Sequence, residues 1–374
     1  MAINGGIPDG FYSVEINYSR FTVPIRYQNL QCRGSGSYGV VCSAVDTANG
    51  DRPVIIKKLR DPFRHVMLAK RALREIFYLR RLRHDNLVDL LDIFTPDNHP
   101  QNLNEIYLVS TDMEADLNER LSREFFTDEQ TCFFMYNFCC GLKYIHSAEV
   151  VHRDLKPENI GISSEGEVQI LDFGLARSAA APSDMTGYIQ TRYWRAPEVV
   201  FRWLPQKYDF GVSHYGTSAD MWSVGCIIGQ MYLNRILFEG GDAILQLGKM
   251  EEIIGSPDDE LIAQMTSPDA RNYLKPRPKR PNMLKSVFQS CPPVVVDLLQ
   301  NLLLWDPAKR FTIEETLNHP YFAQWHDPSD EPKVKKGVMP KPLETNSIEL
   351  MRDAVWKEIH DKTVVTVEEE NSSQ

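Results

Sequence analysis

The segment from Val151 to Glu198 holds polar residues whose types and spacing could transfer a phosphoryl group. In its first motif, HRDLKPEN, Asp154 could accept the proton of an attacking hydroxyl group. Lys156, in the same motif, could neutralise charge on the transferred group. Asn159 and Asp172 would supply the hard oxygen ligands that Mg²⁺ prefers. Chemistry of this kind depends on positioning and charge neutralisation more than on covalent steps.

Three motifs follow one another in this segment: HRDLKPEN, then DFG, then APE. Each carboxylate taken alone could equally be a helix cap or a surface charge. Their order and spacing together indicate a catalytic segment.

A second set of candidates lies near the N-terminus. Residues 34–41, GSGSYGVV, fit the pattern GxGxxGxV, and glycines let backbone N–H groups approach a phosphate. Taken alone, the pattern describes a glycine-rich hairpin equally well. The strand-like run Val54 to Lys57 then places a lysine beneath the loop, and Glu75 follows 18 residues later in a helical pattern. A Lys57–Glu75 pair would fix the ammonium group against the phosphates of a nucleotide.

The elements that must position these residues differ along the chain. Residues 27–56 contain short β-prone runs split by turn signals, residues 66–82 repeat apolar residues at helical spacing, and residues 104–111 contain the strand-like run IYLVS. After residue 128, long apolar-rich helical segments dominate. We therefore expect a strand-rich part with one prominent helix, followed by a helix-rich part.

Composition narrows the class of protein. A chain of 374 residues with 43% hydrophobic and 25% charged residues is an ordinary globular sequence. Its net charge of −10 argues against a general nucleic-acid binder. The seven cysteines are odd in number and form no CxxC pair, which favours reduced thiols. We see neither a signal peptide nor an apolar run long enough to span a bilayer, and expect a soluble intracellular protein.

At this point residues 11–332 resemble a eukaryotic protein kinase, and a mitogen-activated protein kinase in particular. Thr186-Gly-Tyr188, between DFG and APE, resembles the phosphorylation lip of the stress-activated group. Other segments, such as FYSVEI and TRYWRAPEVV, lean towards the c-Jun N-terminal kinases. The branch is left open.

The resemblance implies an α+β, bilobal kinase fold. It assigns residues 27–113 to a small antiparallel-sheet N-lobe with one major helix and residues 114–322 to a large helical C-lobe. Residues 1–26 are expected to form an N-terminal arm, and residues 323–374 a C-terminal extension with a helical stretch at 348–360 and a disordered end.

The resemblance also implies a serine/threonine kinase that uses ATP and Mg²⁺ on Ser/Thr-Pro sites. Asp154, Lys156, Lys57 and Glu75 would be catalytic, and Asn159 and Asp172 would hold the metal. The expected ATP-binding residues are Gly34, Ser35, Gly36, Ser37, Tyr38, Gly39, Val41, Lys57, Ser110, Met113 and Asp116.

Regulation would act through phosphorylation of Thr186 and Tyr188 by an upstream dual-specificity kinase. Each phosphate adds about −1.5 to −2 charges and oxygens that arginines can bind. The candidate partners of the two phosphates are Arg71, Arg74, Arg153 and Arg177 for Thr186, and Arg192 and Arg195 for Tyr188. The alternative is that each arginine pairs with a local carboxylate.

Further partners follow from the same resemblance: substrates with basic docking peptides, and phosphatases. Asp327, Asp330 and Glu331 are candidates for an acidic docking patch, although a solvated charged loop explains such a run as well. We expect a monomer in the cytoplasm and nucleus, with neither a nucleic-acid nor a membrane partner.

Position 55 departs from the family pattern. Ile55 stands where an alanine is usual, under the roof of the adenine site. Overpacking a fitted site costs about 1–3 kcal/mol, which we expect to weaken ATP binding. The small gatekeeper residue Ser110 could return space, though on a different wall of the pocket. A pseudokinase or docking scaffold is therefore the alternative function.

Overall fold

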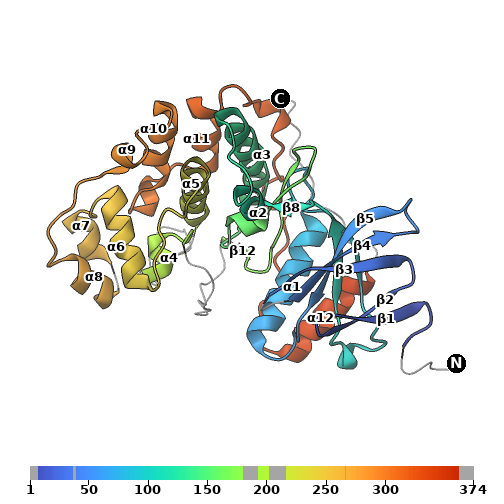
Figure 1. The fold of residues 1–374 in the computed structure, drawn as a ribbon. Coiled ribbons are helices and arrows are strands. Elements are labelled where there is room, and N and C mark those ends of the chain that lie inside the picture. The colour runs from blue at the N-terminus through green and yellow to red at the C-terminus, as the bar shows by residue number, and fades with distance from the viewer. Residues whose placement is uncertain (1–6, 37–38, 180–192, 202–215, 266, 362–374) are drawn as a thin grey trace. The chain divides into compact units, whose positions relative to one another are not determined.

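The computed structural model describes residues 7–36, 39–179, 193–201, 216–265 and 267–361. It divides into two compact units (Figure 1). The first contains residues 1–114, 172–175 and 340–367, and the second contains residues 115–171, 176–339 and 368–374. The division at Glu114 lies one residue from the expected boundary after residue 113.

The first unit is built on a five-stranded antiparallel sheet in the order β3-β4-β5-β7-β6. Its elements are β1 (Phe11–Ile16), β2 (Ser19–Pro24), β3 (Tyr27–Ser35), β4 (Gly39–Asp46), β5 (Arg52–Leu59), α1 (Val66–Arg81), β6 (Leu90–Phe94), the short 3₁₀ helix η1 (Pro100–Asn102), β7 (Tyr107–Thr111) and α12 (Ile348–His360).

The expected N-terminal arm is instead a folded hairpin. β1 and β2 pair in register from Phe11 with Pro24 to Ile16 with Ser19. Phe21 and Val23 are fully buried against one face of the five-stranded sheet. Alternate residues of a strand point to opposite faces, and the apolar alternation of β2 was missed because the run is only six residues long.

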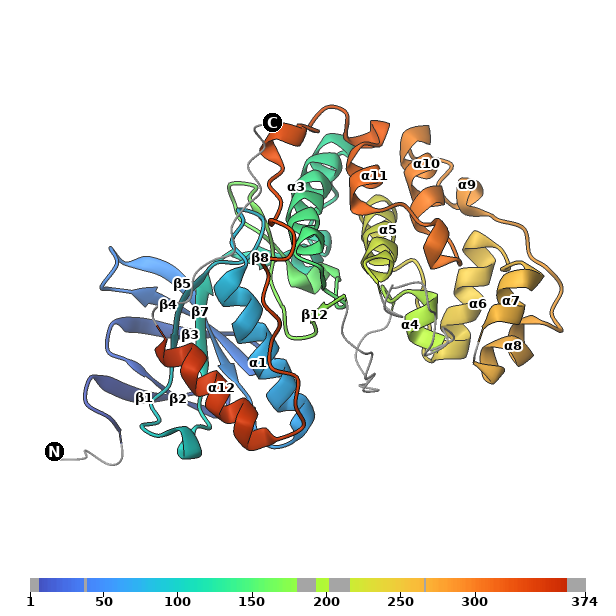
Figure 2. The ribbon, with the colours of Figure 1, turned by 180° about the vertical axis from the view of Figure 1, so that it is seen from behind.

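α1 confirms the helix predicted over residues 66–82. α12 packs against it, which brings the C-terminal segment into the first unit (Figure 2). The Glu358 carboxylate accepts hydrogen bonds from Arg81 at 2.8 and 3.1 Å and from Arg80 at 3.2 Å. Arg74 donates to both oxygens of Glu344 at 3.0 Å. The C-terminal extension was expected to be separate, but its residues 340–361 belong to the first unit.

The second unit is mainly helical. Its elements are β8 (Ala115–Asp116), α2 (Leu117–Leu121), α3 (Asp128–Ser147), β9 (Val150–Val151), η2 (Pro157–Asn159), β10 (Ile160–Ile162), β11 (Val168–Ile170), β12 (Arg177–Ser178), α4 (Pro197–Phe201), α5 (Ser218–Leu233), α6 (Ala243–Ile254), α7 (Asp259–Gln264), α8 (Pro268–Leu274), α9 (Leu284–Val287), α10 (Pro293–Leu302), η3 (Pro307–Lys309), α11 (Ile313–Leu317), η4 (Pro320–Phe322) and η5 (Pro328–Asp330).

α3 and α5 form the centre of the second unit. α3 begins with a capping box, in which Thr127 and Gln130 each accept the other's backbone N–H. This arrangement satisfies two N–H groups that have no partner within the helix. α5 is apolar on nearly all sides and is buried from Ala219 to Met231, as expected of a helix inside a large core.

The two units confirm the predicted α+β class, with an antiparallel sheet first and a helical part after it. Within the described ranges, no helix combines the length and the hydrophobicity needed to cross a bilayer.

Candidate active site

Lys57 lies on the face of the sheet opposite the β1–β2 hairpin. Val54 and Ile56 of β5 are buried in the core beneath the hairpin, so Ile55 and Lys57 point the other way. Val41 stands directly across from Lys57 on β4. The GxGxxGxV pattern and the lysine are therefore brought together by strand register.

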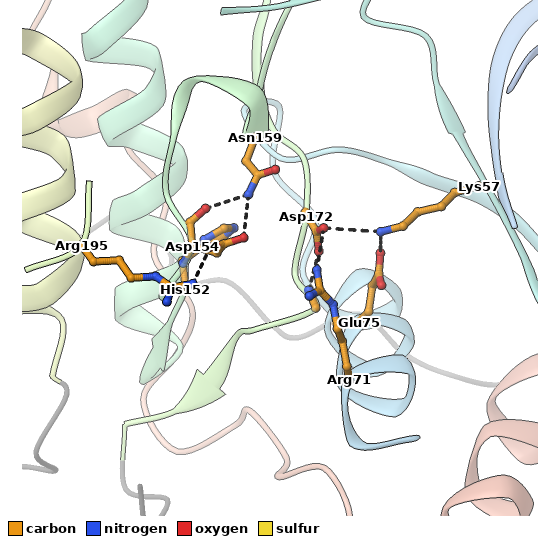
Figure 3. A network of polar contacts seen from close by, with 9 residues as sticks. Lys57, Arg71, Glu75, His152, Asp154, Asn159, Asp172 and Arg195 are labelled. Atoms are coloured by element: carbon orange, nitrogen blue, oxygen red, sulfur yellow. Dashed lines mark hydrogen bonds and ion pairs between the residues drawn. The ribbon is translucent and has the colours of Figure 1, made fainter. Parts of the chain in front are cut away.

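A partly buried ion pair joins Lys57 to α1. The Lys57 ammonium donates to Glu75, whose side chain is 4% exposed, and lies 3.5 Å from Oδ2 of Asp172 (Figure 3). Burial opposes the charged ammonium, but the Asp172 and Glu75 carboxylates outweigh it and raise the pKa of Lys57. Burial also raises the pKa of Glu75, and the nearby ammonium offsets part of that rise. The predicted Lys57–Glu75 pair is formed.

Two further contacts within the first unit hold Asp172. Its Oδ1 accepts the backbone N–H of Gly174 at 2.7 Å. Its Oδ2 accepts from Nη2 of Arg71 at 3.1 Å. Arg71 and Glu75 are four residues apart on α1 and so share one helix face. That face carries both an anion for Lys57 and a cation for Asp172.

In the second unit, a buried carboxylate fixes the loop that carries Asp154. Asp220, near the start of α5, accepts the backbone N–H groups of His152 and Arg153, each at 2.8 Å. It also bonds to Nε2 of His146 at 3.0 Å. Burial alone would raise the pKa of Asp220, but the hydrogen bond and charge of His146 lower it below its ordinary value. Arg153 has a φ of 72°, a left-handed conformation that this anchoring maintains.

The Asp154 side chain lies at the end of this loop. Nδ2 of Asn159 donates to the Asp154 carbonyl at 2.7 Å and lies 3.3 Å from Oδ2 of Asp154 (Figure 3). Arg195 lies 3.6 Å from the other carboxylate oxygen. Asp154 is thus a carboxylate held in position by Asn159, as a residue that orients a hydroxyl group requires. Lys156 is half-buried just before η2.

The two predicted metal ligands belong to different units, and both fit a hard cation. The amide nitrogen of Asn159 is committed to Asp154, so its amide oxygen is the atom left to bind a metal. The Asp172 carboxylate is 22% exposed. Oxygen atoms of this kind, few in number, suit Mg²⁺, which keeps waters and phosphate oxygens in its shell.

The glycine loop is described up to Gly36 and from Gly39 onward. The Gly36 N–H donates to the Gly39 carbonyl at 2.9 Å, which closes the hairpin end. A Cβ at Gly39 would collide with the Lys58 carbonyl oxygen, so the strand pairing itself requires glycine there. The other two predicted loop residues, Ser37 and Tyr38, lie outside the described residues.

Ile55 and Ser110 are direct neighbours, which corrects the expectation that they line different walls. They face each other in the β5–β7 register, and Ser43 of β4 stands on the other side of Ile55. The isoleucine is thus flanked by two small residues on the face that carries Lys57. Met113 is buried. Asp116 caps α2 through the N–H of Glu119 at 2.8 Å, and burial raises its pKa.

Three of the predicted phosphate-binding arginines have carboxylate partners: Arg71 pairs with Asp172, Arg74 with Glu344, and Arg195 with Asp154. Arg177 is buried in β12. Their role towards the lip stays a prediction, since Thr186, Tyr188 and Arg192 lie outside the described residues.

The candidate docking residues do not form one exposed patch. Asp327 and Asp330 are exposed. Glu331 is buried, and its carboxylate bonds to Lys143 at 2.5 Å, His326 at 2.7 Å and Tyr136 at 3.1 Å. Glu331 therefore cannot meet a partner's basic residue without breaking these contacts, because a buried charge depends on its local partners.

Sequence reasoning missed Asp220. The available signal was an aspartate near the start of an otherwise apolar helix, the run ADMWSVG. An acidic residue in that place reads as an ordinary first-turn charge. Nothing in the sequence places it beneath a loop some seventy residues away.

Comparison with known proteins bears on this geometry. Residues 27–322 match the family described as "Protein kinase domain". The chain is 40% identical to "Mitogen-activated protein kinase pmk-1" of Caenorhabditis elegans over 369 residues, which covers 98% of this chain and 95% of the relative. It is 44% identical to "Mitogen-activated protein kinase 14" of Xenopus laevis over 323 residues, which covers 86% of each.

Neither relative bears the name of a c-Jun N-terminal kinase, so the lean towards that branch stays a prediction. The predicted serine/threonine kinase activity is confirmed by the family and by both relatives. The chain belongs to the protein kinase family, and within it to the stress-activated group of mitogen-activated protein kinases.

Proposed function

We propose that this kinase transfers the γ-phosphate of ATP, bound with Mg²⁺, to serine or threonine followed by proline. The observation that carries the proposal is the partly buried Lys57–Glu75 pair beside Asp172. A lysine fixed by an anion presents its remaining N–H donors to phosphate oxygens. The raised pKa of Lys57 keeps it charged at neutral pH.

Asp154 is the residue that accepts the proton of the substrate hydroxyl. Asp220 holds the loop of Asp154 by accepting two backbone N–H groups, and Asn159 orients the Asp154 carboxylate. Orientation of a hydroxyl by a fixed carboxylate is worth orders of magnitude in rate. Asn159 and Asp172 would hold Mg²⁺, which neutralises charge on the phosphate oxygens when bound.

Phosphorylation of Thr186 and Tyr188 by an upstream dual-specificity kinase would activate the chain. Support comes from arginines whose guanidinium groups already pair with carboxylates, such as Arg71 with Asp172 and Arg195 with Asp154. A phosphate carries more charge than a carboxylate and offers three acceptor oxygens. It would compete with Asp172 and Asp154 for these arginines and thereby change the contacts of both carboxylates.

The test is transfer of radiolabel from ATP to a Ser-Pro peptide by protein phosphorylated on the lip. Asp154→Ala is expected to lose at least about 10³-fold in rate, because positioning and proton acceptance are lost together. Asp330→Asn, an exposed acidic change elsewhere in the second unit, serves as the matched control. Equal labelling by wild type and Asp154→Ala would overturn the role of Asp154.

A scaffold that binds partners without transferring phosphate is the second candidate, and Ile55 favours it. Its branched side chain occupies the sheet face two residues from Lys57. Such a protein would bind a basic docking peptide yet label no substrate, even when Thr186 and Tyr188 are phosphorylated. The same assay therefore separates the two candidates.

A further inference from the structure

The guanidinium group of Arg71 binds the Asp172 carboxylate, to which the proposed function assigns a metal ion. Its Nη2 lies 3.1 Å from Oδ2 of Asp172, and the Lys57 ammonium lies 3.5 Å from the same oxygen (Figure 3). The second oxygen, Oδ1, accepts the Gly174 N–H. Both oxygens of Asp172 are thus used by groups of the protein itself.

The position of Arg71 is built into the first unit. The residue is 7% exposed and projects from the same face of α1 as Glu75. A Cβ added at Gly174 would collide with Nε of Arg71 and come within 2.9 Å of Oδ1 of Asp172. The absence of a side chain at Gly174 is therefore what lets the guanidinium lie against the Asp172 turn.

A guanidinium and a divalent cation cannot both use the same carboxylate oxygen fully. Each needs its lone pairs, and the two positive charges repel at short distance. Hydrogen bonds between ionised groups are also the strong ones among protein hydrogen bonds. Binding of a cation to Asp172 must therefore weaken or displace the Arg71 contact.

We infer that Arg71 is an internal competitor of the divalent cation for Asp172 and restrains metal binding by the unphosphorylated kinase. The inference rests on the proposed role of Asp172 as a metal ligand. Any group that draws Arg71 away raises metal affinity, and the coupling is reciprocal. A phosphate on Thr186, for which Arg71 is a candidate partner, is such a group.

The test measures binding of Mn²⁺ by electron paramagnetic resonance, with full-length, phosphatase-treated protein and saturating ADP. Arg71→Gln is expected to bind Mn²⁺ roughly tenfold more tightly than wild type. Arg71→Lys keeps the charge but loses the forked N–H donors, so its affinity should fall between the two. Thermal melting of each variant checks that it is folded.

Lys70→Gln is the matched control, because it removes the same charge from the residue next to Arg71 on α1, and the Lys70 ammonium bonds to Asn346 rather than to Asp172. Its Mn²⁺ affinity should stay within about twofold of wild type, since screening weakens an indirect charge effect. An equal gain by Lys70→Gln, or no gain by either Arg71 variant, overturns the inference.

Asp172→Asn separates this inference from the proposed function. If Asp172→Asn binds Mn²⁺ as tightly as wild type, the metal role of Asp172 fails, and the inference fails with it. If Asp172→Asn abolishes binding while Arg71→Gln leaves it unchanged, only the competition fails. In wild type, phosphorylation of the lip should raise Mn²⁺ affinity, and in Arg71→Gln it should not.

Discussion

Ile55 and Ser110 face each other across β5 and β7, on the side of the sheet that carries Lys57. Directly opposed side chains on neighbouring strands have Cβ atoms about 4.5–5.5 Å apart. The bulk added at position 55 and the space left at position 110 therefore concern one contact, and the two residues should affect nucleotide binding jointly.

Ile55→Ala should tighten nucleotide binding by about tenfold, the low end of what removing an overpacked group yields. The low end is expected because Ser43 and Ser110 leave room on both sides of Ile55. Calorimetric titration with ADP measures the change. Ser110→Val should weaken binding in the wild type more than in the Ile55→Ala variant, because neighbours are not additive. Additive effects would contradict the shared contact.

Glu358→Gln should loosen α12 from α1. Glu358 is 13% exposed and is the anion shared by Arg80 and Arg81. Removing it leaves two partly buried guanidinium groups short of an acceptor, at a cost of about 2 kcal/mol. Hydrogen exchange of the α12 amides should rise accordingly.

Asp353→Asn on the same helix is the control for Glu358→Gln, because Asp353 is exposed and a surface change of this kind stays within about 0.5 kcal/mol. Unchanged α12 exchange in Glu358→Gln would show that apolar packing alone holds this helix.

Much of this architecture was readable from the sequence, because repeated patterns report on local structure. The helical spacing predicted α1 and α12 almost to the residue. The motif order made Asp154, Asn159 and Asp172 candidates for the site, and their roles stay predictions. The strand-like run ending at Lys57 predicted a lysine beneath the glycine loop, and Val41 stands across from it on β4. These features depend on neighbours a few positions apart.

The missed features depend on tertiary contacts. The Ile55–Ser110 contact needs the register of two strands separated by 55 positions. Burial of Glu331 depends on Lys143, which lies 188 residues away on α3. The role of Asp220 depends on where α5 meets the loop of His152 and Arg153. The spacing of residues along the chain does not predict these tertiary contacts.

Asp220→Asn should lower stability most at neutral pH and less in acid. The pKa of Asp220 lies below its ordinary 3.8 in the folded protein, so the carboxylate stabilises the fold fully above the unfolded-state pKa. That contribution is lost as the pH falls through the lower folded-state pKa. We expect a loss of about 3 kcal/mol near neutral pH. Urea denaturation of both proteins at a series of pH values measures it.

Asp297 provides the matched comparison for Asp220. It bonds to Nε2 of His319 at 3.0 Å, the same distance as Asp220 to His146, but its side chain is 67% exposed whereas that of Asp220 is 1% exposed. Asp297→Asn should change stability by less than about 1 kcal/mol. Equal losses from the two substitutions would show that burial of Asp220 does not matter.

Glu331→Gln should destabilise the second unit, whereas Asp330→Asn should not. Glu331 is fully buried as the partner of Lys143, whose side chain is 7% exposed. Removing one charge of a buried pair leaves the other uncompensated, at a cost of about 3–5 kcal/mol. Asp330 is exposed, so Asp330→Asn should change the free energy of unfolding by no more than about 0.5 kcal/mol. Urea denaturation of the two variants measures the difference.

Binding of a basic docking peptide tests which of the two residues belongs to the docking surface. If Asp330→Asn weakens binding of the peptide and fully folded Glu331→Gln does not, the acidic surface is confined to the exposed aspartates. A stable Glu331→Gln that loses the peptide would instead return Glu331 to the docking surface.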